Sequence, residues 1–330
     1  MVWNSIQWKE QFEFLSAQRN RKQKEEAKYL LRKMRADVFK HTVITVISVL
    51  LSVWPIHGQN KLALLIGISE YTKDDAKIND DTWSNIHGVN DVKLLNATLK
   101  EQDFNITTLC NKEATAIKIR KTFKKFTSSC KEGDLVYIHF SCHGQPVEDL
   151  NGDEPDGWDE ALVPIDAKKV YQKGVYEGKN HIIDDELNKC LREIRTKVGK
   201  NGFVYVVVDA CHSGSSYRGD EEEGITRGTN RGFTASDKPF VPKIDKRGKI
   251  EIEKSNVMSD ICILEACRSY QVNSEIQENG IYYGSLSYYV NQVLQNIQLD
   301  NNIIWTNKVS RLMNEDIRLV RQNIVIETSL

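Results

Sequence analysis

Strands buried on both faces are predicted where apolar residues run without interruption between polar segments. Residues 134–140 and 203–208 form two such runs, and each ends in a short motif of small and polar residues. Further strands are predicted at 62–67, 105–110, 261–267 and 324–327. Apolar positions at helical spacing predict helices over 88–99, 114–126, 285–297 and 308–321, with another that begins near 181. This alternation predicts an α/β fold with a mostly parallel sheet sandwiched by helices.

Two segments depart from this regular pattern. Between residues 215 and 257 the periodicity fails and Gly, Ser and charged residues dominate, which predicts an exposed, flexible linker. Before residue 60, a Lys/Arg-rich stretch leads into twelve uncharged residues at 43–54. That run suits a signal peptide beginning near Met34, a short membrane anchor or an amphipathic interaction segment. We divide the chain into an extension (1–59), a first region (60–214), the linker (215–257) and a second region (258–330).

The overall composition excludes several classes of protein. The 330 residues carry a formal net charge of -1 and 40% of them are hydrophobic, so nothing suggests a nucleic-acid surface. The seven cysteines lack the paired spacing of a disulfide framework or a zinc site. We therefore expect an ordinary globular protein, and we expect it to be a monomer.

Candidate catalytic residues follow the two strongest predicted strands. The first strand leads into Ser-Cys-His143-Gly, and the second leads into Asp-Ala-Cys211-His-Ser-Gly. Ligands bind at the carboxyl ends of parallel strands, where the imidazole of His143 and the thiol of Cys211 can meet. A histidine that moves protons beside a thiol that attacks a carbonyl is an arrangement for nucleophilic catalysis. Either residue alone is more often a packed or hydrogen-bonded side chain, but the pair favours catalysis.

Several motifs together carry a resemblance to a known family. They are residues 64–68, Gly88-x-Asn90-Asp91, 140–144, 209–214, 266–269 and Gln322-Asn323-x-x-Ile326-Glu327. In these motifs and their order, the chain from about Lys61 onward resembles type I-like metacaspases of the caspase clan. The resemblance implies a caspase-hemoglobinase fold with a six-stranded sheet. It also implies that 60–214 is the large-subunit-like region and 258–330 the small-subunit-like region.

The resemblance implies a cysteine endopeptidase that cleaves after arginine or lysine. Cys211 corresponds to the nucleophile and His143 to its acid–base partner, and no third member of a catalytic triad is assigned. The pocket for the residue before the cleaved bond corresponds to Asp91, Ser141 and Asp209. Two carboxylates suit a guanidinium or an ammonium group and would repel an aspartate.

The remaining residues near the candidate site are expected to bind the oxyanion or to be structural. We expect the backbone N–H groups of Gly144 and Cys211 to bind the oxyanion of the tetrahedral intermediate. Gly88 departs from the family, which often has cysteine at that position. Cys142 is expected to be a packed thiol, His212 a structural residue of the turn, and Cys267 part of a strand.

Calcium is an expected activator, although the chemistry itself requires no cofactor. Many members of the family need Ca²⁺, and the acidic positions that correspond to their site are Asp159, Asp184 and Asp185. Carboxylate oxygens suit Ca²⁺. A fourth acidic position of the family is Arg218 here. Helix capping and solvated acids are the alternative explanation for these residues.

The linker suggests a zymogen that cleaves itself. We expect exposed basic sites at Arg218, Arg227, Arg231, Lys238, Lys243, Lys246 and Arg247. An enzyme specific for basic residues could cut at any of them, and the sequence alone does not choose the bond.

Two other functions remain open from the sequence. One is a catalytically idle caspase-like module that serves in binding or signalling, and the other is a relative that cleaves after a different residue. Protein or peptide substrates with a basic residue before the cleaved bond are the expected partners. A signal or anchor at 34–59 predicts export or membrane association, with transient membrane contact through 43–54. A cytoplasmic protein is the alternative.

Overall fold

The computed structural model describes most of the chain beyond residue 58. The described residues there are 59–72, 81–154, 156–211, 224–236, 238–242, 244, 246–247, 249–252 and 254–330. Residues 1–58 and 59–330 form two separate compact units. In the first unit, the described residues 21–36 and 38–40 are helical and exposed. No helix among the described residues is long and apolar enough to cross a membrane. The apolar segment 43–54 and His212 lie outside the described residues.

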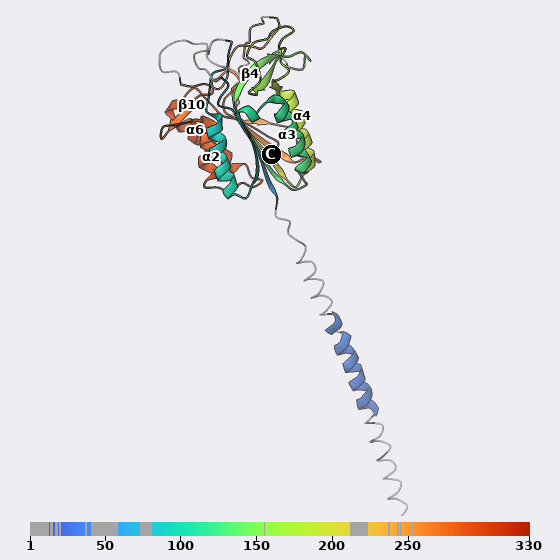
Figure 1. The fold of residues 1–330 in the computed structure, drawn as a ribbon. Helices are drawn as coiled ribbons and strands as arrows, with labels where there is room; N and C mark the ends of the chain where they lie inside the picture. The colour runs from blue at the N-terminus through green and yellow to red at the C-terminus, as the bar shows by residue number, and fades with distance from the viewer. Residues whose placement is uncertain are drawn as a thin grey trace, which may run out of the picture. The chain divides into compact units, whose positions relative to one another are not determined.

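A central sheet organises the second unit (Figure 1). Among the described residues it has seven strands in the order β2-β1-β3-β7-β9-β12-β8. Their bounds are β1 Lys61–Gly67, β2 Asn105–Cys110, β3 Leu135–Ser141, β7 Phe203–Asp209, β8 Lys249–Glu251, β9 Asp260–Glu265 and β12 Val325–Thr328. Every neighbouring pair is parallel except β12 with β9. The mostly parallel sheet is confirmed, but its six expected strands become seven because β8, from the predicted linker, pairs with β12.

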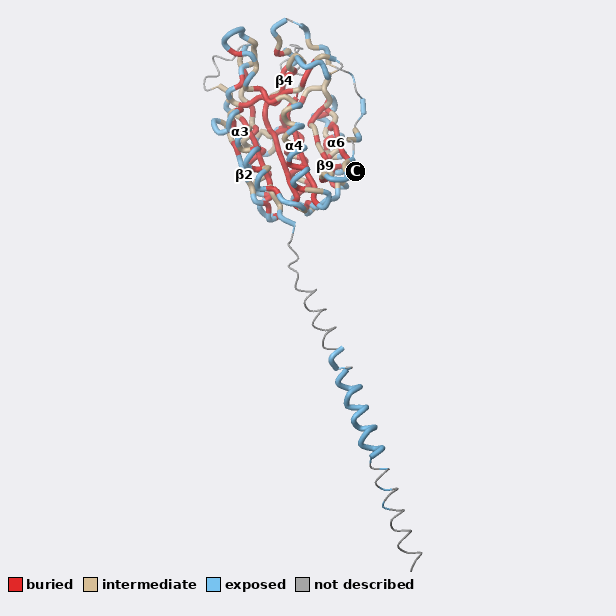
Figure 2. The backbone as a smooth tube through the Cα atoms, turned by 90° about the vertical axis from the view of Figure 1, so that its right-hand side faces the viewer, coloured by how far each residue is buried: buried red, intermediate tan, exposed pale blue. Residues whose placement is uncertain are grey.

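Helices cover both faces of this sheet. They are α2 Gly88–Glu101, α3 Ala116–Ser129, α4 Asp184–Val198, α5 Ser285–Leu294 and α6 Ile304–Glu315. One apolar core joins α2, α5 and α6 to one face, and a second joins α3 and α4 to the other. Figure 1 shows α2 and α6 on one side of the strands and α3 and α4 on the other. Strand β7 serves both cores because its alternate residues point to opposite faces. This is why its sequence is apolar without alternation. Figure 2 shows the buried backbone of the second unit in red, with exposed segments around it.

Smaller elements lie beyond the carboxyl ends of the central strands. A three-stranded sheet contains β4 His143–Glu148, β5 Trp158–Val163 and β6 Ile182–Ile183. Strands β10 Glu275–Glu278 and β11 Ile281–Gly284 form a hairpin. Two 3-10 turns complete the elements, η2 Asn111–Glu113 and η3 Ile317–Leu319. The predicted helix at 308–321 is therefore α6, which begins and ends earlier, followed by the short turn η3.

Candidate active site

The register of two central strands brings the candidate catalytic motifs to one edge of the sheet. Strands β3 and β7 run parallel, and Ser141 pairs with Asp209 at their carboxyl ends. His143 begins β4, two residues after Ser141, and Cys211 follows two residues after Asp209. Both His143 and Cys211 are buried at 1% exposure. The structure thus brings together the two strand ends as the sequence predicts.

Groups that the sequence analysis did not assign fix the tautomer and the orientation of His143. Its Nε2 lies 2.9 Å from the carbonyl oxygen of Ser84. Because a carbonyl only accepts, Nε2 must carry the hydrogen and Nδ1 the lone pair. The buried Nδ1 has no hydrogen-bond partner among the described residues. The indole of Trp83 stacks on the imidazole with centroids 4.8 Å apart, and burial lowers the pKa of His143 to about 4. His143 is therefore a neutral base at pH 7.

The Cys211 thiol has two contacts with the segment that follows β9. The Sγ of Cys211 donates to the carbonyl oxygen of Gln271 at 2.8 Å. It also accepts from the Sγ of Cys267 at 3.2 Å. Cys267, expected only to complete a strand, therefore touches the predicted nucleophile, because β9 is the parallel neighbour of β7. Cys142 is a packed thiol, and burial raises its pKa to about 12. A thiol with a raised pKa stays protonated at neutral pH, so Cys142 is a poor candidate nucleophile.

Part of the predicted linker lies in the active site. Arg227 has an exposure of 0%, whereas the sequence predicted an exposed basic residue. The backbone N–H groups of Cys211 and Gly144 both donate to the carbonyl oxygen of Arg227, at 3.0 and 3.3 Å. These are the two groups expected to bind an oxyanion. The next residue, Gly228, forms bridges with both Gly144 and Cys211. A side chain at Gly228 would overlap the carbonyl oxygen of Cys211, so glycine permits this close approach.

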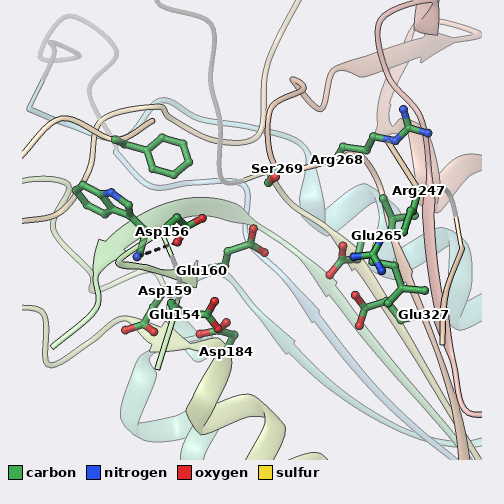
Figure 3. A pocket seen from close by; sticks show the side chains of 14 residues that line it. Glu154, Asp156, Asp159, Glu160, Asp184, Arg247, Glu265, Arg268, Ser269 and Glu327 are labelled. Carbon is green, nitrogen blue, oxygen red and sulfur yellow. Dashed lines mark hydrogen bonds between the residues drawn. The ribbon is translucent and has the colours of Figure 1, made fainter. Parts of the chain in front are cut away.

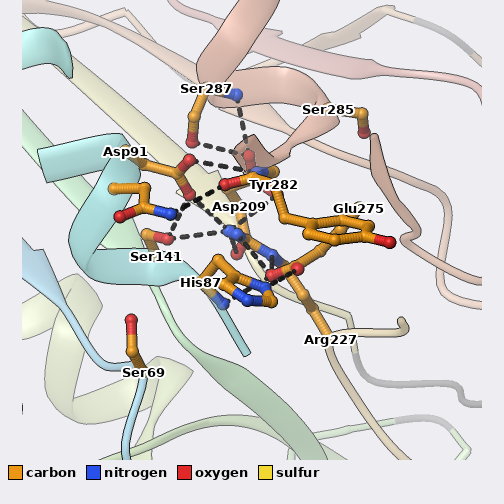
Figure 4. A network of polar contacts seen from close by, with 12 residues as sticks. Ser69, His87, Asp91, Ser141, Asp209, Arg227, Glu275, Tyr282, Ser285 and Ser287 are labelled. Atoms are coloured by element: carbon orange, nitrogen blue, oxygen red, sulfur yellow. Dashed lines mark hydrogen bonds and ion pairs between the residues drawn. The ribbon is translucent and has the colours of Figure 1, made fainter. Parts of the chain in front are cut away.

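The guanidinium of Arg227 fills an acidic pocket (Figure 4). Its Nη1 lies 2.7 Å from both Asp91 Oδ2 and Ser141 Oγ, and 3.5 Å from Asp209 Oδ1. Its other edge contacts Glu275 Oε1, from Nε at 3.0 Å and from Nη2 at 2.8 Å. The structure therefore assembles Asp91, Ser141 and Asp209 as predicted and adds Glu275, which the sequence analysis missed.

The pocket carboxyl groups titrate differently because their partners differ. Burial and the nearby Asp209 raise the pKa of Asp91 to about 7, and the Arg227 guanidinium opposes this rise. For Asp209 burial also raises the pKa, but Arg227 and hydrogen bonds from Asn273 and Ser287 hold it below its usual value. Asn273 Nδ2 lies 2.7 Å and the Ser287 hydroxyl 2.6 Å from this carboxylate. Asp209 is therefore the more firmly ionised of the two.

The backbone around Arg227 pairs with residues 273–275 like an added β-strand. The Arg227 N–H donates to the carbonyl oxygen of Asn273 at 3.0 Å, and the Glu275 N–H donates to that of Ile225 at 2.8 Å. Thr226 and Ser274 form the antiparallel bridge between them. Addition of an extended peptide to a strand edge is a common mode of peptide recognition. The docked segment therefore occupies the site in the manner of an extended peptide substrate.

Two of the three expected calcium residues line an acidic pocket on the same unit, and Asp185 does not (Figure 3). Asp159 and Asp184 both line it, along with Glu154, Asp156, Glu160, Glu265 and Glu327. Burial raises the pKa of Asp159 to about 6 and that of Asp184 to about 7. Asp185 accepts a hydrogen bond from Asn151 at 2.7 Å.

Asp159 has the features of a cation ligand. Its buried Oδ1 has no hydrogen-bond partner within the described part of the chain. Ligand atoms of Asp149, Asp153 and Asp159 lie within 4.8 Å of one another. These residues fit a hard cation such as Ca²⁺, which takes carboxylate oxygens. The group centred on Asp159 differs from the expected set, since Asp149 and Asp153 belong to it.

Taken together, the parallel sheet and the His143–Cys211 edge define a caspase-like cysteine peptidase domain. A family model described as "Caspase domain" matches residues 60–323, and the chain belongs to this family.

Curated relatives agree with this assignment, and a solved structure shares the fold. Metacaspase-2 of Arabidopsis thaliana is 32% identical over 209 residues, which cover 60% of this chain and 40% of the relative. Metacaspase-1 of Schizosaccharomyces pombe is 26% identical over 284 residues, covering 73% of this chain and 61% of the relative. The chain thus spans less than two thirds of either relative. A crystal structure of a protein from Geobacter sulfurreducens has a TM-score of 0.55 at 21% identity, covering 82% of this chain and 93% of that one. The resemblance to metacaspases and the expected fold are confirmed.

Proposed function

We propose that the chain is a cysteine endopeptidase that cleaves after basic residues, and that its own Arg227–Gly228 bond is a substrate. One observation carries this proposal: Arg227 has its carbonyl oxygen on the N–H groups of Cys211 and Gly144 and its guanidinium among buried carboxylates. A peptide bond held in this way is positioned for attack by a thiol in the same site.

The proposed chemistry assigns a role to each of two side chains. Cys211 Sγ transfers its proton to Nδ1 of His143 and attacks the carbonyl carbon of the residue in the acidic pocket. The N–H groups of Gly144 and Cys211 donate to the resulting oxyanion. His143 then gives the proton to the departing amine as the C–N bond breaks, which leaves a thioester on Cys211. Water, deprotonated by His143, hydrolyses the thioester, releases a carboxylate and regenerates the thiol.

The self-cleavage experiment uses the full chain. Mass spectrometry of the purified protein should find a cut after Arg227, and the Cys211→Ala variant should remain one chain. Arg227→Gln should prevent this cut. Arg231→Gln is the matched control, since Arg231 lies in the same linker but pairs with Asp81 at a half-exposed position, Nη1 to Oδ1 at 2.7 Å. A cut after Arg227 that persists in Cys211→Ala would contradict the proposal.

Cleavage of other substrates requires a separate measurement. Reporter peptides that end in Arg or Lys should release fluorophore, and a peptide that ends in Asp should not, because buried carboxylates repel it. Cys211→Ala is again the control. A folded protein that cuts none of these peptides and leaves its own chain intact would instead be an idle caspase-like binding module.

We further propose that Ca²⁺ activates the enzyme through the acidic group around Asp159. The ion would neutralise Asp159, whose pKa is raised by burial and by the nearby carboxylates. Millimolar Ca²⁺ should raise the melting temperature of the Cys211→Ala chain, which cannot cleave itself, and Asp159→Asn should abolish this shift. Equal shifts in both proteins would place the effect of calcium elsewhere. Export of the protein and its monomeric state stay predictions.

A further inference from the structure

We propose that Glu275, oriented by His87, makes the acidic pocket select arginine over lysine. This inference rests on the proposed function, because it concerns the residue that the same site accepts before the cleaved bond. It assigns a role to two residues that the sequence analysis did not connect with the site.

The three pocket carboxylates contact two different edges of the guanidinium. Asp91 and Asp209 lie around Nη1, at 2.7 and 3.5 Å. Within the described part of the chain, Glu275 is the carboxylate at the opposite edge, where Oε1 accepts from Nε at 3.0 Å and from Nη2 at 2.8 Å. Figure 4 shows Glu275 on the opposite side of the guanidinium from Asp91. One side of the pocket therefore binds the Nη1 group, and the other side requires donors at both Nε and Nη2.

Glu275 is held in place by contacts other than those with Arg227. Its side chain has an exposure of 0%. The backbone N–H of His87 donates to Oε1 at 2.7 Å, and Nδ1 of His87 lies 2.5 Å from Oε2. The His87 ring in turn stacks on Tyr282 with centroids 5.0 Å apart. His87 is thus a positioning residue that contacts both oxygens of the carboxylate.

A lysine side chain can satisfy only one of the two edges. Its ammonium is a single point charge, which can reach Asp91 and Asp209, but a methylene occupies the place of Nε. Glu275 would then lose two charge-assisted donors while it stays buried, and a buried charge without its partners is costly. Arginine places a donor at both edges simultaneously. We expect kcat/KM for an arginine peptide to exceed that for the matched lysine peptide by about 10- to 100-fold.

The test compares two peptides that differ only in Arg or Lys before the reporter group. Both peptides compete with the same internal segment around Arg227, so the ratio of their kcat/KM values is independent of that competition. Glu275→Gln keeps the size of the side chain and removes its charge. Glu278→Gln is the matched control, because Glu278 lies on the same strand β10 but pairs with Arg318 at a partly exposed site, 2.8 Å from Nη2.

The expected result is a loss of discrimination that is specific to Glu275. In Glu275→Gln the arginine rate should fall by about 10-fold or more while the lysine rate changes little, so the ratio approaches 1. Glu278→Gln should keep the parental ratio. His87→Ala should lower the ratio by a smaller amount, because the rate for the arginine peptide falls while that for the lysine peptide does not. A smaller fraction of folded protein would lower both rates equally and leave the ratio unchanged. Melting curves of each variant verify that the proteins are folded.

Different failures have different meanings. If the parental enzyme cleaves both peptides in a Cys211-dependent way and the ratio is unchanged in Glu275→Gln, the role of Glu275 is refuted while the proposed function stands. If the parental enzyme cleaves neither peptide, the proposed function fails, and the inference about Glu275 fails with it.

Discussion

Gly284 offers a sharp test of the acidic pocket because one added methyl group would fill it. A Cβ at this position would overlap Oδ2 of Asp209 and Nη1 of Arg227. The backbone itself does not require glycine, since φ is −63° and ψ is 135°, angles that alanine adopts readily. Gly284→Ala should therefore impair the pocket without straining the chain.

The size of the effect follows from the contacts that would be lost. The methyl group pushes Nη1 away from Asp91 and Ser141, which are both at 2.7 Å. Hydrogen bonds to charged groups contribute about 1.5–3 kcal/mol each. Loss of the two costs at least about 3 kcal/mol, which lowers kcat/KM for arginine peptides by about 100-fold or more.

The assay is cleavage of an arginine reporter peptide, together with a melting curve. Gly224→Ala is the matched control, because among the described residues a Cβ there would meet only the carbonyl oxygen of Glu275, at 4.0 Å. It should keep the parental rate. A folded Gly284→Ala enzyme that cleaves arginine peptides at the parental rate would refute the assignment of this pocket to the arginine side chain.

Three other predictions concern proton binding, support of the pocket and the second thiol. The value of kcat/KM for arginine peptides should fall as the pH drops through about 7, because Asp91 becomes protonated and loses its charge there. His143, with a pKa of about 4, stays neutral over this range. The pH profile of Asp91→Asn should therefore lack this step. Gln322→Ala should lower the melting temperature by several degrees, because the buried Nε2 lies within hydrogen-bond distance of Ala266 O, Asn273 Oδ1 and Ser285 Oγ and alanine removes these contacts; an unchanged melting curve would contradict this. Cys142→Ala should keep peptide cleavage within about twofold, since its thiol is packed and its pKa raised by burial, and a loss comparable to that of Cys211→Ala would overturn the assignment of the nucleophile.

Features carried by local pattern could be predicted from the sequence. The apolar runs of β3 and β7 mark strands buried on both faces, and the motifs behind them place His143 and Cys211 at one edge. The structure assembles the predicted pocket residues Asp91, Ser141 and Asp209 because they lie at the end or the beginning of regular elements. Periodicity locates the ends of these elements, and the resemblance to the family singles out the pocket residues that lie there.

Contacts made by residues in irregular segments, or between residues far apart in the sequence, could not be predicted. Ser84 holds His143 through its backbone carbonyl, so its side chain gives no signal. Glu275 and His87 meet across 188 positions of the sequence, which no spacing indicates. Arg227 lies in a polar stretch without periodicity, and charge alone predicted an exposed residue. Its burial depends on three carboxylates from β10, α2 and β7, a tertiary environment that overrides local composition.

The strand-like docking of residues 225–227 also has a kinetic consequence. Because this segment belongs to the same chain as Cys211, the site meets it at an effective concentration of the order of millimolar, far above that of a dilute substrate. Self-cleavage should then be first order, with a half-time that dilution of the protein does not change. Cleavage of other proteins would begin only when the docked strand leaves. The pace of activation would accordingly be set by dissociation of an internal competitor rather than by the supply of substrate.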